Sequence, residues 1–325
     1  MPRLTTPPRP LDVTATFPEL APLARTTIRL HPRPGSPATA DSSLGGPLLW
    51  PAVEPWPTCS EHPAALALSP DEVRHRRRIL DAARNRPHPE GTDFLTPDER
   101  VIVDGASQPR PIPQPGPIPL LPITQLYARD TPETVAFPAP PGADLLQLLW
   151  CPFDHKGRTG PTPRTELRWR TTAHITDPLT AAPHPAVIGK DRYLPEPCVL
   201  HPEPVTEYPA PHELPEPLAD RVEDWAESHG VGYQYDLAVA PGCKLGGHAP
   251  WSYTDPFPMA CPECGAPVQP LLTIDGYESG GITWRPLGES PVPGRPTHLN
   301  IGRDHALQIY VCTTSYDHPH QQYIQ

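Results

Sequence analysis

Two apolar runs with the same polar interruption organise this chain. The runs Leu145–Trp150 (LLQLLW) and Leu307–Cys312 (LQIYVC) each carry one glutamine among apolar residues. Continuous apolar runs of this length are typical of strands that are buried on both faces. Each run leads into a cysteine followed by an Asp-His pair, which ends at His155 in the first case and at His318 in the second. We therefore expect two equivalent buried strands with similar chemistry at their ends.

Other landmarks recur in the same order in both halves of the chain. Leu44–Gly46 and Leu245–Gly247 both read LGG, and a stretch rich in proline and aromatic residues then leads to Cys59 or Cys261. The apolar segments LLPIT and LLTI follow, before the two glutamine-containing runs. Four matches in one order indicate an internal duplication. Short leucine-rich strands can also resemble each other by chance.

Alternating polar and apolar positions predict further strands. They lie at residues 26–30, 165–172 and 233–239, and the short apolar run 101–103 is a weak further candidate. Two helices are predicted from their ends. Ser69 is a good N-cap before Pro70 and two acidic residues, so a helix should run to about Asn85. An apolar stripe over residues 215–229, closed by Gly230, predicts the second helix.

We therefore expect an α+β, β-rich fold with two related antiparallel β units and few helices. Its parts are an N-terminal tail at 1–22, a first β unit at 23–160, a connecting segment with strand and helix at 161–240, and a second β unit at 241–325. A proline-rich insertion at 64–118 distinguishes the first unit. Its tract Ser107–Pro119 should be extended, as a spacer or as a proline-rich ligand for another domain.

Composition excludes some function classes. The chain has 55 prolines among 325 residues, but seven tryptophans and ten tyrosines are spread along it, so we expect a folded, loop-rich protein. The net charge of −11 argues against nucleic acid as the main partner, because phosphate binding favours a basic face. The basic block Arg74–Arg78 is interpreted as a solvated helix face.

No apolar stretch has the length of a signal peptide or a transmembrane helix, so we expect a cytoplasmic protein that does not contact a membrane. The excess of arginine over lysine suggests GC-rich coding and a bacterial, actinobacterium-like source. In a reducing cytoplasm the seven cysteines should be buried thiols, metal ligands or a nucleophile rather than disulfides.

The most specific motif is the knuckle Cys261-Pro-Glu-Cys264-Gly265. Two cysteines separated by two residues on a tight turn can direct both thiolates to one tetrahedral zinc ion. Redox dithiols share this spacing, but the strand–helix context of a thioredoxin-like site is missing here. Because a knuckle supplies two ligands, the other two must come from elsewhere in the chain.

The repeated strand ends can supply them. Cys59 and His62 align with Cys261 and Cys264, so each half can combine a knuckle with a strand end. We predict two structural zinc ions per chain. The predicted ligands are Cys59, His62, Cys151 and His155 for the first site, and Cys261, Cys264, Cys312 and His318 for the second.

Simpler interpretations exist for several of these residues. His62 could be a solvated loop residue, and Cys151 and Cys312 could be buried apolar thiols. His320 competes with His318 for the second site, and His318 is preferred because it shares the Asp-His pair. Two cysteines lack a counterpart in the other half and are interpreted as core thiols; they are Cys198 and Cys243. Four aromatic residues near the second LGG could form a ligand cleft, although core packing is preferred; they are Tyr233, Tyr235, Trp251 and Tyr253.

In combination, five segments resemble the YwqG-like family, a bacterial domain family of unknown function with long actinobacterial members. They are SSLGGPLLWP (Ser42–Pro51), DLLQLLWCPFDH (Asp144–His155), YQYDLAVAPGCKLGG (Tyr233–Gly247), the CPECG knuckle and GITWRP (Gly281–Pro286). The resemblance covers roughly residues 20–325 and implies a duplicated, β-rich fold without an established activity. Relatives often carry a second Cys-x-x-Cys where this chain has Cys312-Thr-Thr-Ser315, so His318 must replace a ligand. A loose association of the family with SUKH-type immunity and toxin-neighbourhood proteins favours a binding role.

Two hypotheses for the function follow. The preferred one is a non-catalytic, zinc-stabilised module that recognises a protein or peptide, with the insertion at 64–118 as an adaptable arm. The alternative is a zinc-dependent hydrolase in which His62 does not bind, water takes its place, and Glu61 or Asp154 acts as general base. The chain has none of the common phosphate-binding, dinucleotide-binding, serine-hydrolase or zinc-protease motifs. No catalytic residue or organic cofactor is therefore assigned, and the oligomeric state is left open.

Overall fold

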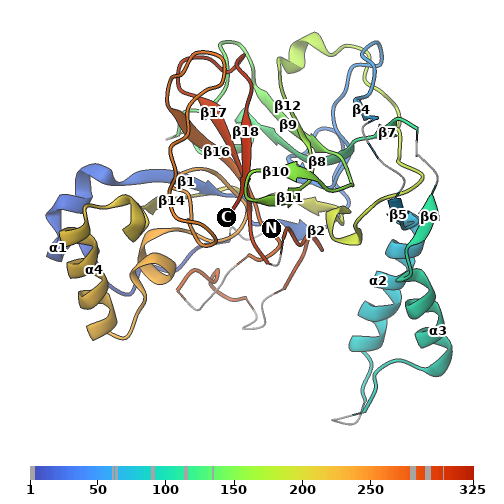
Figure 1. Ribbon diagram of the computed structural model, residues 1–325, viewed down its shortest axis with the longest axis horizontal. Coiled ribbons are helices and arrows are strands. Elements are labelled where there is room, and N and C mark those ends of the chain that lie inside the picture. Colours follow the sequence, from blue (N-terminus) through green and yellow to red (C-terminus); the bar gives the residue numbers. More distant parts are fainter. Residues whose placement is uncertain are drawn as a thin grey trace.

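Two six-stranded sheets and few helices make up the described chain, so the predicted α+β, β-rich class is confirmed (Figure 1). The computed structural model describes residues 4–60, 62, 65–88, 92–112, 116–133, 135–278, 283–289, 294–302 and 304–325. Within this part of the chain, all strand pairs of the two large sheets are antiparallel. Also within it, no helix combines the length and the apolar character that a bilayer span requires.

The first sheet has the strand order β12-β9-β8-β3-β13-β2. Its strands are β2 (Arg33–Pro34), β3 (Ser43–Leu44), β8 (Leu121–Tyr127), β9 (Leu145–Trp150), β12 (Thr165–Arg170) and β13 (Cys198–Val199). The second sheet has the order β14-β1-β15-β16-β17-β18. Its strands are β1 (Arg25–Arg29), β14 (Glu203–Glu207), β15 (Lys244–Gly246), β16 (Val268–Ile274), β17 (Leu307–Cys312) and β18 (Gln321–Ile324).

Burial on both faces explains why β9 and β17 are continuous apolar runs. In β9, Leu146, Leu148 and Trp150 belong to a central apolar cluster that draws residues from both sheets. Leu149 points to a second cluster on the outer face of the first sheet. In β17, Tyr310 likewise joins a separate outer cluster, which also contains residues of the helix α4 (Glu216–Ser228). The molecule is thus a sandwich whose two sheets are both covered on their outer faces.

The two apolar runs that contain a glutamine, β9 and β17, occupy equivalent positions in their sheets. β9 pairs with β8 and β17 pairs with β16, and each partner strand has one register shift, between Pro122 and Thr124 or between Pro270 and Leu272. Beyond the shift, Gln147 lies opposite Gln125, and Gln308 lies opposite Thr273. The strand order around both pairs also agrees. The match supports an internal duplication, which itself stays a prediction.

The chain passes between the sheets twice, which ties them together. It leaves the second sheet at the end of β1 and enters the first at β2, and it returns between β13 and β14. The division at 1–22, 23–160, 161–240 and 241–325 stays a prediction, and sheet membership does not follow it strictly. β1 lies in the sheet of the second unit, and β12 lies in the sheet of the first.

The predicted helices at Ser69–Asn85 and 215–229 are confirmed. They correspond to α2 (Pro70–Arg84), capped by the Ser69 hydroxyl, and to α4, after which Gly230 adopts a left-handed φ of 73°. At the N-terminus, α1 (Val13–Thr16) leads to Phe17, whose ring packs edge-on against Trp225 of α4 at 5.5 Å between centroids.

Two predicted strands are wrong. Residues 101–103 lie in α3 (Pro97–Ala106), because Thr96 and Glu99 form a capping box that outweighs the β-propensity of Val-Ile-Val. Residues 233–239 lie largely in a π-helical turn, Tyr233–Ala238. Here Asp236 accepts a hydrogen bond from the Gly232 N–H at 2.8 Å, which closes the turn locally.

The insertion is folded and attached to the body of the protein. Three two-stranded pairs occur in the described chain outside the large sheets: β4 (Thr58–Cys59) with β7 (Ile118–Pro119), β5 (Ala65–Ala67) with β6 (Arg110–Ile112), and β10 (His155–Gly157) with β11 (Gly160–Thr162). Parts of the tract Ser107–Pro119 are therefore extended, as predicted, and paired. Val73 of α2 is fully buried in the central cluster. Figure 1 shows α2 and α3 side by side, on the opposite side of the sheets from α1 and α4.

Candidate metal centres

A tight turn at the Cys261 knuckle brings two thiols together. The Gly265 N–H donates to the Cys261 carbonyl at 2.9 Å, and the Cys261 N–H donates to the Ala266 carbonyl at 2.8 Å. Gly265 has a φ of 72°, a left-handed conformation that glycine adopts without a steric cost. Both cysteine side chains can therefore point to the same side of the turn.

The end of β17 completes this second cluster. Cys312 is the last residue of β17, and its Sγ lies 3.6 Å from Cys264 Sγ. His318, in the connection to β18, places Nδ1 3.5 Å from Cys261 Sγ. The Thr314 N–H also donates to Cys312 Sγ at 3.3 Å. The alternative ligand, His320, lies within hydrogen-bond distance of the Thr165 hydroxyl instead, with 2.8 Å between Nε2 and Oγ1.

The first cluster is assembled around the end of β9, the strand of the first sheet that is equivalent to β17. Cys59 belongs to β4, Cys151 directly follows β9, and His155 begins β10. Cys59 Sγ lies 3.7 Å from His155 Nε2, and His62 Nε2 lies 2.9 Å from Cys151 Sγ. The ring of His62 packs against Phe153 with 4.7 Å between centroids. His62 is only 8% exposed, so it is a buried residue of the cluster rather than a solvated loop residue.

The structure thus brings together all eight residues that the sequence suggested, in the two predicted groups. In each group the four potential ligand atoms lie within 4.8 Å of one another. Each cluster could hold one metal ion. Whether these residues bind a metal, and which one, stays a prediction at this point.

The cysteine thiols at the two strand ends differ in how readily they lose the proton that a metal must replace. Burial raises the pKa of the Cys151 thiol, helped by the neighbouring Cys59, so a metal must displace a proton there. Burial also acts to raise the pKa of Cys312. Hydrogen bonds from the Thr314 and Ser315 backbone and from His318 outweigh it and lower that pKa to about 6. The second cluster therefore offers a thiolate more readily.

Cys198 and Cys243 lie outside both clusters. Their Sγ atoms each lie 3.3 Å from a backbone carbonyl, that of Pro296 or Asp275. Burial raises the pKa of both thiols. These contacts agree with the interpretation of both residues as core thiols.

Of the two general bases considered for a hydrolase, only Asp154 lies among the described residues. Glu61 lies outside the described residues. Asp154 accepts a hydrogen bond from the Tyr193 hydroxyl at 2.7 Å and pairs with Lys190 Nζ at 3.1 Å. Its carboxylate is therefore already held by two neighbours.

The insertion begins at the first cluster. Cys59 pairs with Ile118 across β4 and β7, while in the second half Ala260 bridges directly to Pro267 around the knuckle. The whole segment that carries α2 and α3 thus occupies the place of the short turn between Cys261 and Ala266. A metal at the first cluster would fix the base of this inserted segment.

Sequence reasoning missed a buried charged group at the crossing between the sheets. His31, with a left-handed φ of 43°, contacts Glu278 through Nδ1 and lies 3.0 Å from Glu203 through Nε2. Arg29 pairs with the same Glu278 at 3.5 Å and is 1% exposed. These residues are far apart in the sequence and follow no motif spacing, so no local signal could have found them.

Comparison with known proteins does not identify the chain: no family model matches it, and neither does any curated protein.

Proposed function

We propose that this protein is a non-catalytic module, stabilised by two zinc ions, that recognises a protein or peptide partner. The observation that carries the proposal is the pair of four-donor clusters at equivalent strand ends. The first cluster also lies at the base of an inserted helical pair. A fold that uses two metals to fix strand ends and an insertion is organised for display rather than for chemistry.

The donor sets favour zinc. Thiolate and imidazole together are the ligands of structural zinc sites, as Cys₂His₂ or Cys₃His. Zinc–sulfur bonds of about 2.3 Å and zinc–nitrogen bonds of about 2.0 Å imply tetrahedral edges of roughly 3.5 Å between sulfur and nitrogen and roughly 3.8 Å between two sulfurs. Three of the measured separations, 3.5, 3.6 and 3.7 Å, already agree with these edges. The His62–Cys151 pair, at 2.9 Å, would move apart when an ion enters.

Four protein donors argue against the hydrolase alternative. A catalytic zinc keeps one coordination position for water, whereas a structural zinc has four protein ligands. In the first cluster His62, whose ring packs against Phe153, would take the position that the water needs. The proposal includes the resemblance to the YwqG-like family and a cytoplasmic location, where thiols stay reduced and available to a metal.

The outer helix of the insertion offers a contact surface. Val101 and Ile102 of α3 are 73% and 43% exposed, although both are apolar. α2 is anchored, since Arg77 donates to the Leu194 carbonyl at 2.9 Å and pairs with Glu196. In this proposal α2 is therefore the support, and α3 contacts the partner.

Metal content tests the first part of the proposal. Protein purified without added metal should contain two zinc ions per chain, and Cys59→Ser or Cys264→Ser should each remove one. Cys198→Ser is the matched control, because it changes a buried thiol outside both clusters, and should retain both ions. X-ray absorption at the zinc edge of the Cys264→Ser protein should then show two sulfur neighbours and the outer-shell scattering of two imidazole rings. Scattering from one imidazole ring, with a light atom in place of the second, would favour the hydrolase.

Cross-linking in the cells of origin tests the second part. A partner should be captured by the wild type and by Val53→Asp, which changes a still more exposed valine (89% against 73% for Val101) elsewhere on the surface. Val101→Asp should abolish the capture. A specific partner captured equally by all three would refute the role of α3, and the absence of any partner would refute the binding function.

A further inference from the structure

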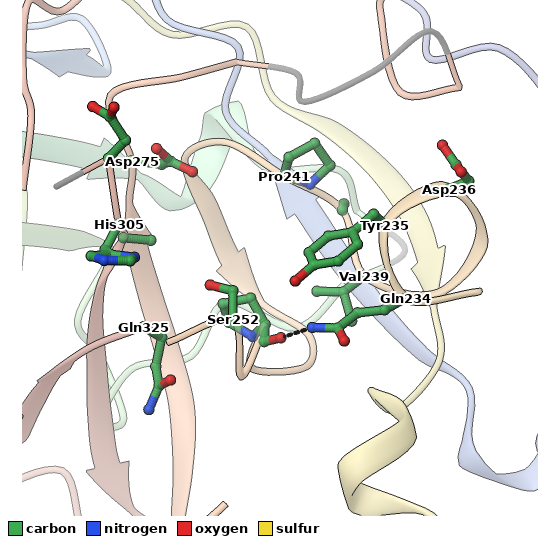
Figure 2. Close-up of a pocket in the computed structure, with 13 residues that line it drawn as sticks. Gln234, Tyr235, Asp236, Val239, Pro241, Ser252, Asp275, His305 and Gln325 are labelled. Carbon is green, nitrogen blue, oxygen red and sulfur yellow. Dashed lines mark hydrogen bonds between the residues drawn. The ribbon is translucent and has the colours of Figure 1, made fainter. Parts of the chain in front are cut away.

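A cavity of about 210 Å³ lies at the end of the β16–β17 pair that is opposite to the second cluster. Asp275, which follows β16, and Ala306, which precedes β17, both line it. The π-helical turn contributes Gln234, Tyr235 and Asp236. Figure 2 shows Tyr235 and His305 on opposite sides of this cavity. The cavity is therefore distinct from both metal clusters.

Its volume fits a single side chain. Pockets for drug-sized ligands occupy roughly 300–1,000 Å³, so this cavity is too small for most of them. Part of its wall is apolar and includes Val239, Pro241 and Pro250. Such a wall suits the aliphatic stem of a long side chain, whose polar end would reach the acidic residues.

The charged residues around the cavity indicate that its ligand is positively charged. Three aspartates line the cavity (Asp236, Asp275 and Asp304), whereas its described lining residues include no lysine or arginine. Two guanidiniums lie close to it: Arg295 pairs with Asp304, and Arg9 donates to the Asp236 carbonyl at 3.3 Å. Neither neutralises Asp275, which accepts the Tyr277 N–H at 3.0 Å. Burial raises the pKa of Asp275 to about 6, so a bound cation would stabilise its charged form.

Exposed aromatic rings flank the cavity. Tyr235 is 64% exposed, and Tyr253, which is 51% exposed, packs against His305 with 4.3 Å between ring centroids. Burial lowers the pKa of His305, so this ring is neutral near pH 7. Tyr233 and Trp251, the other two aromatic residues noted in the sequence, are buried, as core packing predicts. Exposed tyrosines beside a pocket are typical of binding hot spots, and their faces attract cations.

We propose that this cavity receives a basic side chain, lysine or arginine, of a polypeptide partner, and that Tyr235 and Tyr253 flank its cationic end. The proposal rests on the proposed binding function, because it names the chemistry that the module recognises. A cationic group would pair with Asp275, and the two tyrosine rings would contribute cation–π contact. An anionic ligand would meet three carboxylates and no cationic group in the described lining.

Short peptides test the proposal on the full-length, metal-loaded protein. The probes are the blocked tripeptides Gly-Lys-Gly and Gly-Arg-Gly, with Gly-norleucine-Gly as the uncharged control, and binding is followed by NMR. At least one basic tripeptide should bind saturably with a dissociation constant below about 20 mM. The norleucine peptide should bind at least about tenfold more weakly. Equal binding of all three, or no binding of either basic peptide, would overturn the proposal. n-Butylamine binding as tightly as the tripeptides would overturn the assignment to a polypeptide.

Variants locate the binding. Tyr235→Ala should lower the affinity for the basic peptide by about fivefold, which is the size of a cation–π contact. Asp275→Asn should lower this affinity further. Asp71→Asn is the matched control, since Asp71 is a 95% exposed carboxylate on α2. If Asp275→Asn fails to fold, the exposed Tyr235 keeps the test decisive. A native partner captured equally by wild type and Tyr235→Ala would refute this cavity as the site while leaving the proposed function intact.

Discussion

Lys244 Nζ lies 2.5 Å from Glu207 Oε1 inside the second sheet, and neither side chain is more than 1% exposed. The same carboxylate accepts the N–H groups of Ala240 and His248, each at 2.7 Å. The ammonium also donates to the His248 carbonyl at 2.9 Å. The pair therefore fixes β14, β15 and the loop after β15 at one point. A buried ion pair of this kind contributes little net stability, but it is costly to break.

Lys244→Met should lower the free energy of unfolding by about 3–5 kcal/mol, because it leaves the Glu207 carboxylate buried without its cation. Urea unfolding at neutral pH measures this loss. The double variant Lys244→Met/Glu207→Gln should lose less unfolding free energy than the two single variants lose together, since it removes both charges. An additive double variant would show that the two groups do not interact.

The last glycine of the second LGG motif, Gly247, leaves no room for a side chain. Gly247 has a φ of 79°, and a Cβ added there would lie 2.1 Å from Glu207 Oε2. Gly230 has a similar φ of 73°, but a Cβ there would meet nothing within 4 Å. Gly230→Ala should therefore cost only the left-handed conformation, about 1–2 kcal/mol. Gly247→Ala should cost clearly more in the same unfolding experiment, and equal losses would contradict the clash.

Patterns along the chain predicted those features that depend on neighbouring residues. β9 and β17 could be recognised as continuous apolar runs because both of their faces are buried. The N-cap of α2 and the glycine after α4 marked ends of these helices. The spacing of two residues between Cys261 and Cys264 predicted a pair of metal ligands. The cluster residues at the strand ends could be predicted because the strand ends repeat.

Features that depend on distant contacts could not be predicted. β1 belongs to the second sheet because it pairs with β14 and β15, more than 170 residues away along the chain. The turn Tyr233–Ala238 has the alternation of a strand, yet Trp284 donates from Nε1 to the Tyr235 carbonyl at 2.8 Å and helps to hold a π-helical conformation. The Lys244–Glu207 pair joins two strands whose sequences carry no signal of each other.

Glu278 should make the protein sensitive to acid. Burial alone would raise the pKa of this carboxyl group, but His31, Arg29 and Arg33 outweigh burial and hold the pKa below its usual range. A lowered folded-state pKa gives stability above the unfolded value of about 4.3. That stability is lost as pH falls through the lower folded value.

Urea unfolding of wild type and Glu278→Gln, compared between about pH 3 and pH 6, measures this contribution. The stability difference between the two proteins should be largest near pH 6 and should shrink as the pH falls. Any loss of metal in acid affects both proteins and cancels in the difference. A difference that does not change with pH would rule out this role of Glu278.

If each cluster holds a zinc ion, as proposed, the two ions should leave at different rates. Cys264 of the second cluster is exposed, whereas Cys59, His62 and Cys151 of the first cluster are buried. A chelator should therefore remove one equivalent quickly and the second slowly. Zinc release followed with a chromophoric chelator should show two phases, and Cys264→Ser should lack the fast one. Loss of the slow phase in Cys264→Ser would reverse the assignment.

Removal of the first metal should loosen the inserted helices. The insertion begins at residue 64, two residues after His62. Structural zinc contributes on the order of 10–16 kcal/mol to folding in small zinc fingers. α3 has little burial of its own, since Ala106 is its one buried residue. Its hydrogen exchange therefore depends on a fixed base. In Cys59→Ser the amides of α3 should exchange at least about tenfold faster than in wild type, equal to a loss of about 1.4 kcal/mol in local stability. Cys264→Ser, which disrupts the distant second cluster, should leave α3 unchanged. Equal acceleration in both variants would mean that the metals act on the whole fold and not on the base of the insertion.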